Sequence, residues 1–99
     1  MHITFVKKIL ADGTPCKKCR EVSDRMDAEG ILPHINHIVI ADERDVQSEG
    51  MRLAHKHQVQ RAPFFLVEEA GEITVFDVYF KFKKHLADRG VQLASPTSL

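Results

Sequence analysis

A short apolar run in the middle of the chain constrains the fold most. Residues 35–41 carry Ile38, Val39 and Ile40 at their centre. Continuous apolar runs of this length are typical of parallel strands that lie inside a sheet and are covered on both faces. The run therefore predicts a central parallel strand and an α/β domain whose helices cover the sheet.

The residues before this run predict its neighbour in the sheet. β-Branched and aromatic side chains at residues 3–6 indicate a first strand that continues toward Leu10, and residues 12–15 carry turn signals. From Cys16 the apolar residues follow helical spacing, and Gly30 ends the pattern. The first strand, this helix and the apolar run form a βαβ unit, for which we expect parallel strands and a right-handed crossover.

The second half of the chain predicts a helix, a hairpin and a last helix. Helical spacing over residues 46–57 places Val46 on the apolar face of the second helix. Two apolar strands, residues 64–67 and 73–76, flank a turn that contains a glycine and form a β-hairpin. Residues 78–86 return to helical spacing, with a basic later half that suits the end of a helix.

Length, composition and charge limit the protein to one ordinary domain. The 99 residues, 43% hydrophobic and 28% charged, suffice for a single core, so we expect a domain at residues 1–90 and a flexible tail at residues 91–99. Fourteen basic and fourteen acidic residues give no net charge toward nucleic acid or a membrane surface. The chain has no run of about 18 apolar residues and no signal-like start. We therefore expect a cytoplasmic monomer without a nucleic-acid or membrane partner.

The two cysteines, three positions apart, are the candidate catalytic residues. A lone C-x-x-C in a cytosolic protein indicates redox or metal chemistry more than a structural disulfide. Cys16 falls at the start of the first helix, where free N–H groups and the helix dipole favour a thiolate. Lys17 and Lys18 add positive charge that stabilises the thiolate. Cys16 is thus the predicted nucleophile, and Cys19, one turn inward on the apolar stripe, is the predicted resolving thiol.

Histidines offer an alternative in which the cysteines belong to a zinc site. Structural zinc takes four protein ligands, and this chain has only two cysteines. His55 and His57 are two positions apart on a predicted helix, so their side chains diverge. A site that uses His34 and His37 remains the less favoured alternative. We expect no metal site and expect His34 and His37 to be polar surface residues.

The second informative position is Pro63, directly before the hairpin. By itself it indicates a strand entry or a cis turn. Together, the segment at residues 14–19 (Thr-Pro-Cys-Lys-Lys-Cys), the Ala62-Pro63 pair and the order of elements resemble the thioredoxin superfamily, most closely its glutaredoxin-like branch. The resemblance covers residues 2–89. It implies a thioredoxin-like fold, a four-stranded mixed sheet in the order β-α-β-α-β-β-α with three helices packed on it.

The same resemblance implies roles for residues outside the cysteine motif. It implies that Pro63 follows a cis bond and packs beside the sulfurs, and that the backbone of Ala62 docks the substrate. Glutathione-using members carry two glycines before an aspartate after the last strand; this chain has only the aspartate, Asp77. Asp77 is thus either a possible glutathione-side contact or the cap of the last helix. The Lys17-Lys18 pair matches neither the thioredoxin nor the glutaredoxin motif, so neither group's redox potential carries over.

These observations lead to one main hypothesis and two alternatives. The main hypothesis is a thiol-disulfide oxidoreductase that acts on protein disulfides or glutathione mixed disulfides. It needs no tightly bound cofactor, and its external reductant is glutathione or a thioredoxin reductase. The second hypothesis is a thioredoxin-fold carrier of a metal ion or iron-sulfur cluster held by the same two cysteines. The third is a non-catalytic interaction module. The sequence leaves the physiological substrate and reductant open.

Overall fold

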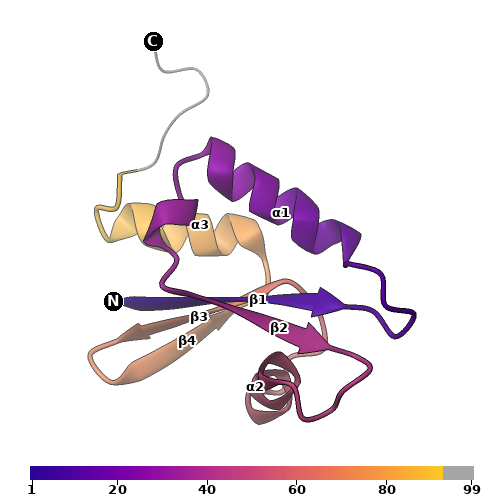
Figure 1. Cartoon of the computed structure of the whole chain (residues 1–99). Helices are drawn as coiled ribbons and strands as arrows, with labels where there is room; N and C mark the ends of the chain where they lie inside the picture. Colours follow the sequence, from indigo (N-terminus) through magenta and orange to yellow (C-terminus); the bar gives the residue numbers. More distant parts are fainter. Residues whose placement is uncertain (93–99) are drawn as a thin grey trace.

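The centre of the molecule is a four-stranded sheet in the spatial order β2-β1-β3-β4 (Figure 1). The structure is a computed structural model that describes residues 1–92. Strands β1 (His2–Ile9) and β2 (His37–Asp42) are parallel, as predicted. Strand β3 (Phe64–Glu69) runs antiparallel to β1, and β4 (Glu72–Phe76) runs antiparallel to β3. The predicted α/β class and mixed sheet are confirmed; most of the predicted tail, residues 93–99, lies outside the described residues.

Helices cover both faces of this sheet. Helices α1 (Lys17–Ala28) and α3 (Tyr79–Asp88) lie on one face, and α2 (Glu49–His57) lies on the other (Figure 1). A single 3₁₀ turn, η1 (Leu32–His34), which the sequence pattern did not predict, leads from α1 toward β2. Within the described residues, no helix combines the length and apolar character needed to cross a membrane.

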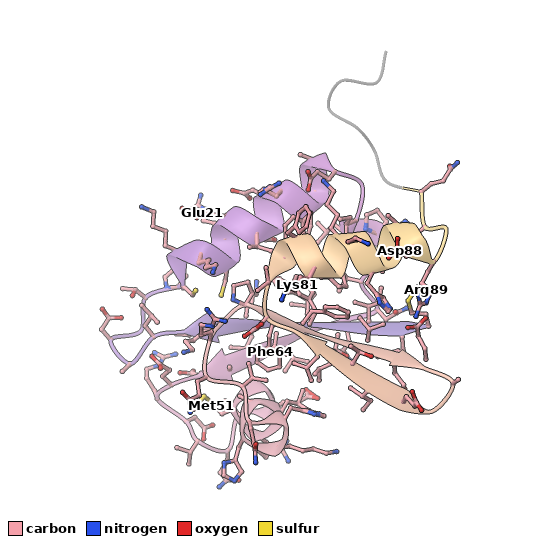
Figure 2. All side chains as sticks on the ribbon, turned by 180° about the vertical axis from the view of Figure 1, so that it is seen from behind. Glu21, Met51, Phe64, Lys81, Asp88 and Arg89 are labelled. Atoms are coloured by element: carbon pink, nitrogen blue, oxygen red, sulfur yellow. The ribbon has the colours of Figure 1, made fainter. Side chains whose placement is uncertain are left out.

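Alternation along the strands produces two separate cores. On the α1 and α3 side, Phe5 and Phe65 stack, and the Phe65 ring lies 3.9 Å from that of Phe82 on α3, measured between centroids. On the opposite side, Phe64 belongs to a cluster against which Met51 of α2 packs (Figure 2). Adjacent residues of one strand therefore pack into different cores, because successive side chains of a β-strand point to opposite faces of the sheet.

Strand β2 corrects the prediction made from the apolar run. It lies beside β1 as expected, but it is an edge strand instead of a central one. Val39 and Ala41 are buried on the α2 side, whereas Ile38 is 50% exposed. The core under α1 and α3 contains no side chain from β2. Apolar composition alone did not reveal that only one face of this strand is covered by a core.

Helix α2 packs unusually close to β2, and its position depends on a glycine. A Cβ atom at Gly50 would lie 2.3 Å from the Ala41 nitrogen and 2.4 Å from the Ile40 carbonyl carbon. The hydroxyl of Ser48, directly before α2, accepts a hydrogen bond from the Asp42 N–H at 3.0 Å and fixes this loop to the strand. Because α2 begins only at Glu49, the prediction that Val46 lies on its buried face is wrong; Val46 is 70% exposed.

Candidate functional site

Cys16 occupies the N-cap of α1, directly after the loop that follows β1. Its extended backbone (φ −68°, ψ 121°) precedes the first helical residue, and its Sγ accepts a hydrogen bond from the Cys19 N–H at 3.2 Å. The Cys16 N–H donates to the Lys8 carbonyl at 3.1 Å, which ties the cap to the end of β1. The sulfur of Cys16 is therefore held at a helix start while the residue stays partly accessible.

Cys19 has a different environment one turn later. It is 3% exposed, and its Sγ accepts a hydrogen bond from the Lys8 N–H at 3.4 Å. Burial raises the pKa of the Cys19 thiol to about 12; the nearby Cys16 sulfur adds to this increase, and the Lys8 N–H opposes it. At neutral pH Cys19 is therefore a protonated thiol. Both cysteines are free in this structure, and the helical spacing of their positions puts the two sulfurs within one turn.

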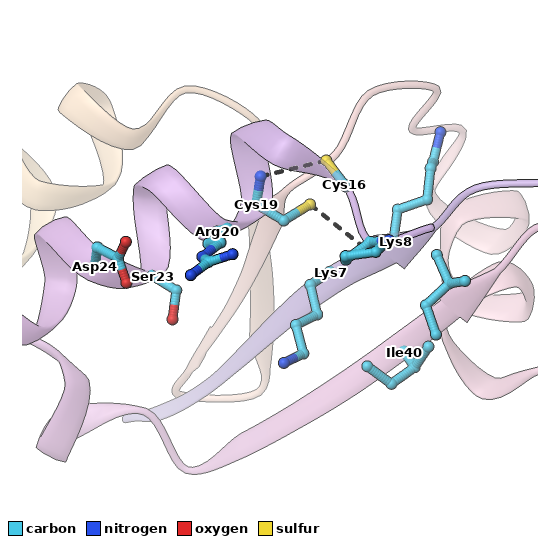
Figure 3. Close-up of a pocket in the computed structure, with 10 residues that line it drawn as sticks. Lys7, Lys8, Cys16, Cys19, Arg20, Ser23, Asp24 and Ile40 are labelled. Atoms are coloured by element: carbon cyan, nitrogen blue, oxygen red, sulfur yellow. Dashed lines mark hydrogen bonds between the residues drawn. The ribbon is translucent and has the colours of Figure 1, made fainter. Parts of the chain in front are cut away.

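Both cysteines line a cavity of about 320 Å³ between α1 and the edge of the sheet (Figure 3). Strand β1 contributes Lys7 and α1 contributes Arg20, and both side chains extend toward the space between the helix and β2 (Figure 3). The remaining lining residues come from β1, α1, β2 and the loop before α1: Lys8, Ile9, Pro15, Ser23, Asp24 and Ile40. The cavity thus combines two sulfurs, cationic side chains and an apolar wall.

The cations at this cavity differ from those that the sequence pattern predicted. Lys17 and Lys18 are exposed on the first turn of α1 and do not line the cavity. Lys7 and Arg20 were missed, although two signals point to them. By strand alternation Lys7 shares the face of Phe5, and Arg20 follows Cys16 by four positions, which is one helical turn.

The other predicted site residues, Ala62, Pro63 and Asp77, do not line the cysteine cavity. The Ala62–Pro63 peptide bond is cis, as the resemblance implied. Pro63 is buried, and Ala62 lines a hollow of about 250 Å³ that shares Lys8 with the cysteine cavity. Asp77 does not line the cysteine cavity; its carboxylate forms an ion pair with Arg61 at 3.0 Å. The alternative prediction that Asp77 caps α3 is wrong, because Val78 occupies the N-cap and no side chain bonds there.

The histidines considered for zinc lie apart from the cysteines. His34 and His37 are exposed, and the nearest carboxylate of His37 is that of Glu49, at 3.8 Å. His55 is exposed and His57 is partly buried on α2. Across residues 1–92, no three side chains of the His, Cys, Asp and Glu types gather in a way that could hold a metal ion.

A second polar cluster, which the sequence analysis missed, lies at the other end of α1. Glu29, at the C-cap, is 8% exposed; its carboxylate accepts hydrogen bonds from the Tyr79 hydroxyl at 2.6 Å and the Lys83 ammonium at 2.7 Å. Arg25 lies 3.5 Å away. The Lys83 hydrogen bond, with help from Tyr79, holds the pKa of Glu29 below its ordinary value. We name these four residues the Glu29 cluster, and they join α1 to α3.

Comparison with known proteins gives no assignment for this chain: no protein-family model matches it, and no curated protein does. An accessible sulfur at a helix start, a buried thiol one turn later and a cavity that both line can together support the making and breaking of a disulfide.

Proposed function

We propose that this chain is a thiol-disulfide oxidoreductase of thioredoxin-like fold in which Cys16 is the nucleophile and Cys19 the resolving thiol. The unequal surroundings of the two sulfurs carry the proposal. Cys16 is accessible and accepts an N–H at a helix N-terminus, whereas Cys19 is buried with a raised pKa. Disulfide exchange needs a thiolate that attacks first and a second thiol that completes the exchange. The two unequal sulfurs suit these two steps.

In the first step the Cys16 thiolate attacks one sulfur of a substrate disulfide. The substrate S–S bond breaks, a Cys16–substrate mixed disulfide forms, and the other half leaves as a thiolate that takes a proton from water. The N–H of Cys19 and the helix dipole stabilise the negative charge on Cys16 before the attack.

In the second step Cys19 resolves the mixed disulfide. When Cys16 enters the mixed disulfide it loses its negative charge, and with it its part in raising the pKa of Cys19. The Lys8 N–H then favours the Cys19 thiolate, whose proton passes to solvent. Attack on Cys16 closes the Cys16–Cys19 disulfide and releases the second substrate thiol. The protein loses two electrons and the substrate gains them, so an external thiol reductant must restore the dithiol.

The thioredoxin-like fold is supported by the strand and helix order and by the position of the cysteines after the first strand. On this basis the partners we propose are a protein disulfide or a glutathione mixed disulfide. The reductant is glutathione or a thioredoxin reductase, and the place of action is the cytoplasm. We propose that Ala62, at the hollow that shares Lys8 with the cysteine cavity, docks the substrate backbone.

The proposal is tested by coupling the protein to reduction of 2-hydroxyethyl disulfide with dithiothreitol in excess. We expect catalysis by the wild-type protein and none by Cys16→Ser. Reduced Cys19→Ser that is treated with the disulfide alone, without dithiothreitol, should accumulate a mixed disulfide at Cys16, seen as an added mass. Lys81→Gln is the matched control variant, because Lys81 is exposed on α3. Full activity in Cys16→Ser would refute the mechanism. Zinc or iron in the purified protein, held by the cysteines, would favour the carrier hypothesis instead.

A further inference from the structure

We propose that the cavity between α1 and β2 binds a carboxylate on the substrate, so that the preferred substrates are low-molecular-weight disulfides with an acidic group close to the sulfur. This inference rests on the proposed function, because it names the substrate class for the same two cysteines. Its evidence is the charge, the lining and the size of the cavity.

The first observation is that two of the three cations that line the cavity have no carboxylate partner. Neither the Lys7 ammonium nor the Arg20 guanidinium forms an ion pair or side-chain hydrogen bond with another described residue, whereas Lys8 pairs with Glu43 at 3.5 Å. Asp24 lines the cavity one helical turn after Arg20 and still does not pair with it. With Lys8 paired to Glu43, two unpaired cations against one carboxylate leave the cavity positive, although the whole chain carries no net charge.

The second observation concerns the walls and the size of the cavity. Ile9 and Ile40 form an apolar wall, available because β2 is an edge strand whose α1-facing side is left out of the core. The volume of about 320 Å³ is at the small end of the range for ligand sites, about 300–1,000 Å³. A short aliphatic chain that ends in a carboxylate matches this combination, with its sulfur directed at Cys16.

The cavity is also separate from the place that the resemblance implied for glutathione. Asp77, the residue predicted for that contact, lies at a different hollow and is paired with Arg61. The carboxylate subsite is formed instead by β1, α1 and β2, the side of the cysteines where Lys7 and Arg20 have no partners.

The test compares three disulfides of similar length that differ in charge: 3,3′-dithiodipropionate, 2-hydroxyethyl disulfide and cystamine. The rate of oxidation of the reduced protein is measured for each and divided by the rate for free dithiothreitol, which corrects for intrinsic reactivity. We expect a preference of about 10-fold for the anion over the neutral disulfide at low salt, which falls as ionic strength rises, and the slowest reaction with cystamine.

Charge variants then locate the preference. Lys7→Gln and Arg20→Gln should each lower the ratio of anionic to neutral rates about threefold, and Asp24→Asn should raise it by a similar factor. Lys81→Gln, an exposed lysine on α3 without an ion pair, is the matched control and should leave the ratio unchanged (Figure 2). An equal rate for all three disulfides, or a ratio that is the same in all four variants, would overturn the carboxylate subsite.

The outcome for the neutral disulfide separates the two proposals. If 2-hydroxyethyl disulfide oxidises the cysteines without a preference for the anion, the subsite is refuted and the oxidoreductase proposal stands. If no disulfide reacts, the proposed function fails. Binding can then be judged by titrating the double variant Cys16→Ser, Cys19→Ser with 3-hydroxypropionate and observing amide shifts by NMR. Shifts at Lys7 and Arg20 would support the subsite, and their absence would refute it.

Discussion

The two ends of α1 hold their charged groups in opposite ways. At the C-terminal end, the Glu29 carboxylate accepts hydrogen bonds from Tyr79 and Lys83 of α3, and Glu29 itself is buried. At the N-terminal end, Lys7 and Arg20 face a cavity without carboxylate partners beside the accessible Cys16. The comparison teaches that charges already paired inside the protein stabilise the fold, whereas unpaired charges beside a nucleophile remain available to a ligand.

The position of α3 explains this difference. Tyr79 and Lys83 belong to α3, so the C-terminal end of α1 meets a helix that supplies a hydroxyl and an ammonium. The N-terminal end of α1 lies instead toward the edge strand β2, where Ile40 forms the cavity wall. The same helix is therefore a stabilising element at one end and part of the candidate site at the other.

The largest expected effect is the loss of activity when the cysteine at the N-terminal end of α1 is replaced. Cys16→Ser should lower disulfide reduction by a factor on the order of 10³ or more, because it removes the attacking sulfur. It should leave the urea midpoint of unfolding nearly unchanged, since Cys16 is only partly buried. The two readouts are the coupled reduction assay and urea unfolding followed by circular dichroism. A variant that kept its activity, or that lost it only by unfolding, would contradict the assignment.

The next effect, at the C-terminal end of α1, is a loss of stability without a loss of activity. Glu29→Ala should lower the free energy of unfolding by about 2 kcal/mol, because it removes two hydrogen bonds to a buried charge. The activity per folded molecule should not change. Glu21→Ala is the matched control, since Glu21 is exposed on the same helix (Figure 2) and its loss should cost less than about 0.5 kcal/mol. Equal losses in both variants would show that the Glu29 cluster does not hold the helices together.

A smaller effect appears in the pH dependence of stability. The pKa of Glu29 is lowered in the folded state, first by the Lys83 hydrogen bond and then by Tyr79. Its contribution to stability is therefore present above the ordinary glutamate pKa of 4.5 and lost as the pH falls from there through the folded-state pKa. Urea unfolding between about pH 3 and pH 6 should show a steeper loss in the wild type than in Glu29→Gln.

Other carboxylates also contribute to the loss of stability in acid. Asp12, Asp42 and Glu69 also have lowered pKa values, caused chiefly by hydrogen bonds from Thr14, Arg44 and His85 respectively. The Glu29→Gln protein should therefore still lose stability in acid, but with a shallower slope. Identical slopes in the two proteins would exclude Glu29 as a source of acid sensitivity.

The smallest expected effect concerns the lysines between the cysteines. Lys17→Gln and Lys18→Gln should each change the alkylation rate of Cys16 by less than about twofold, because both side chains are exposed, screened by salt and outside the cavity that the cysteines line. The rate is measured with iodoacetamide at low and at moderate ionic strength. A tenfold decrease in either variant would show that the lysine contributes strongly to stabilisation of the Cys16 thiolate.

Local patterns in the sequence were sufficient for most of the fold. Changes of period predicted the four strands and three helices, and the βαβ order gave the parallel pair β1 and β2. The edge position of β2 could not be predicted, because it depends on β3 pairing with the other side of β1, a contact between distant segments. Ile38 is as apolar as its buried neighbour Val39, so composition does not indicate which face is open.

The candidate site was predicted only where its residues are close in sequence. The spacing of Cys16 and Cys19 at a helix start is a local pattern that the sequence shows. As predicted, Cys19 is the more buried of the two. The Glu29–Tyr79 hydrogen bond joins residues 50 positions apart, so the sequence pattern around Glu29 does not predict it. For Asp77 the sequence predicts a glutathione-side contact or a helix cap, and neither alternative includes the ion pair that it forms with Arg61, 16 positions earlier.

The most direct test of the central claim is the alkylation of the fully reduced wild-type protein by iodoacetamide near neutral pH, with peptide mapping of each cysteine over time. We expect Cys16 to be modified about 100-fold or more faster than Cys19, because Cys19 is 3% exposed and its pKa is raised to about 12. In urea the two rates should become similar. Equal rates in the folded protein, or faster modification of Cys19, would contradict the assignment of Cys16 as nucleophile.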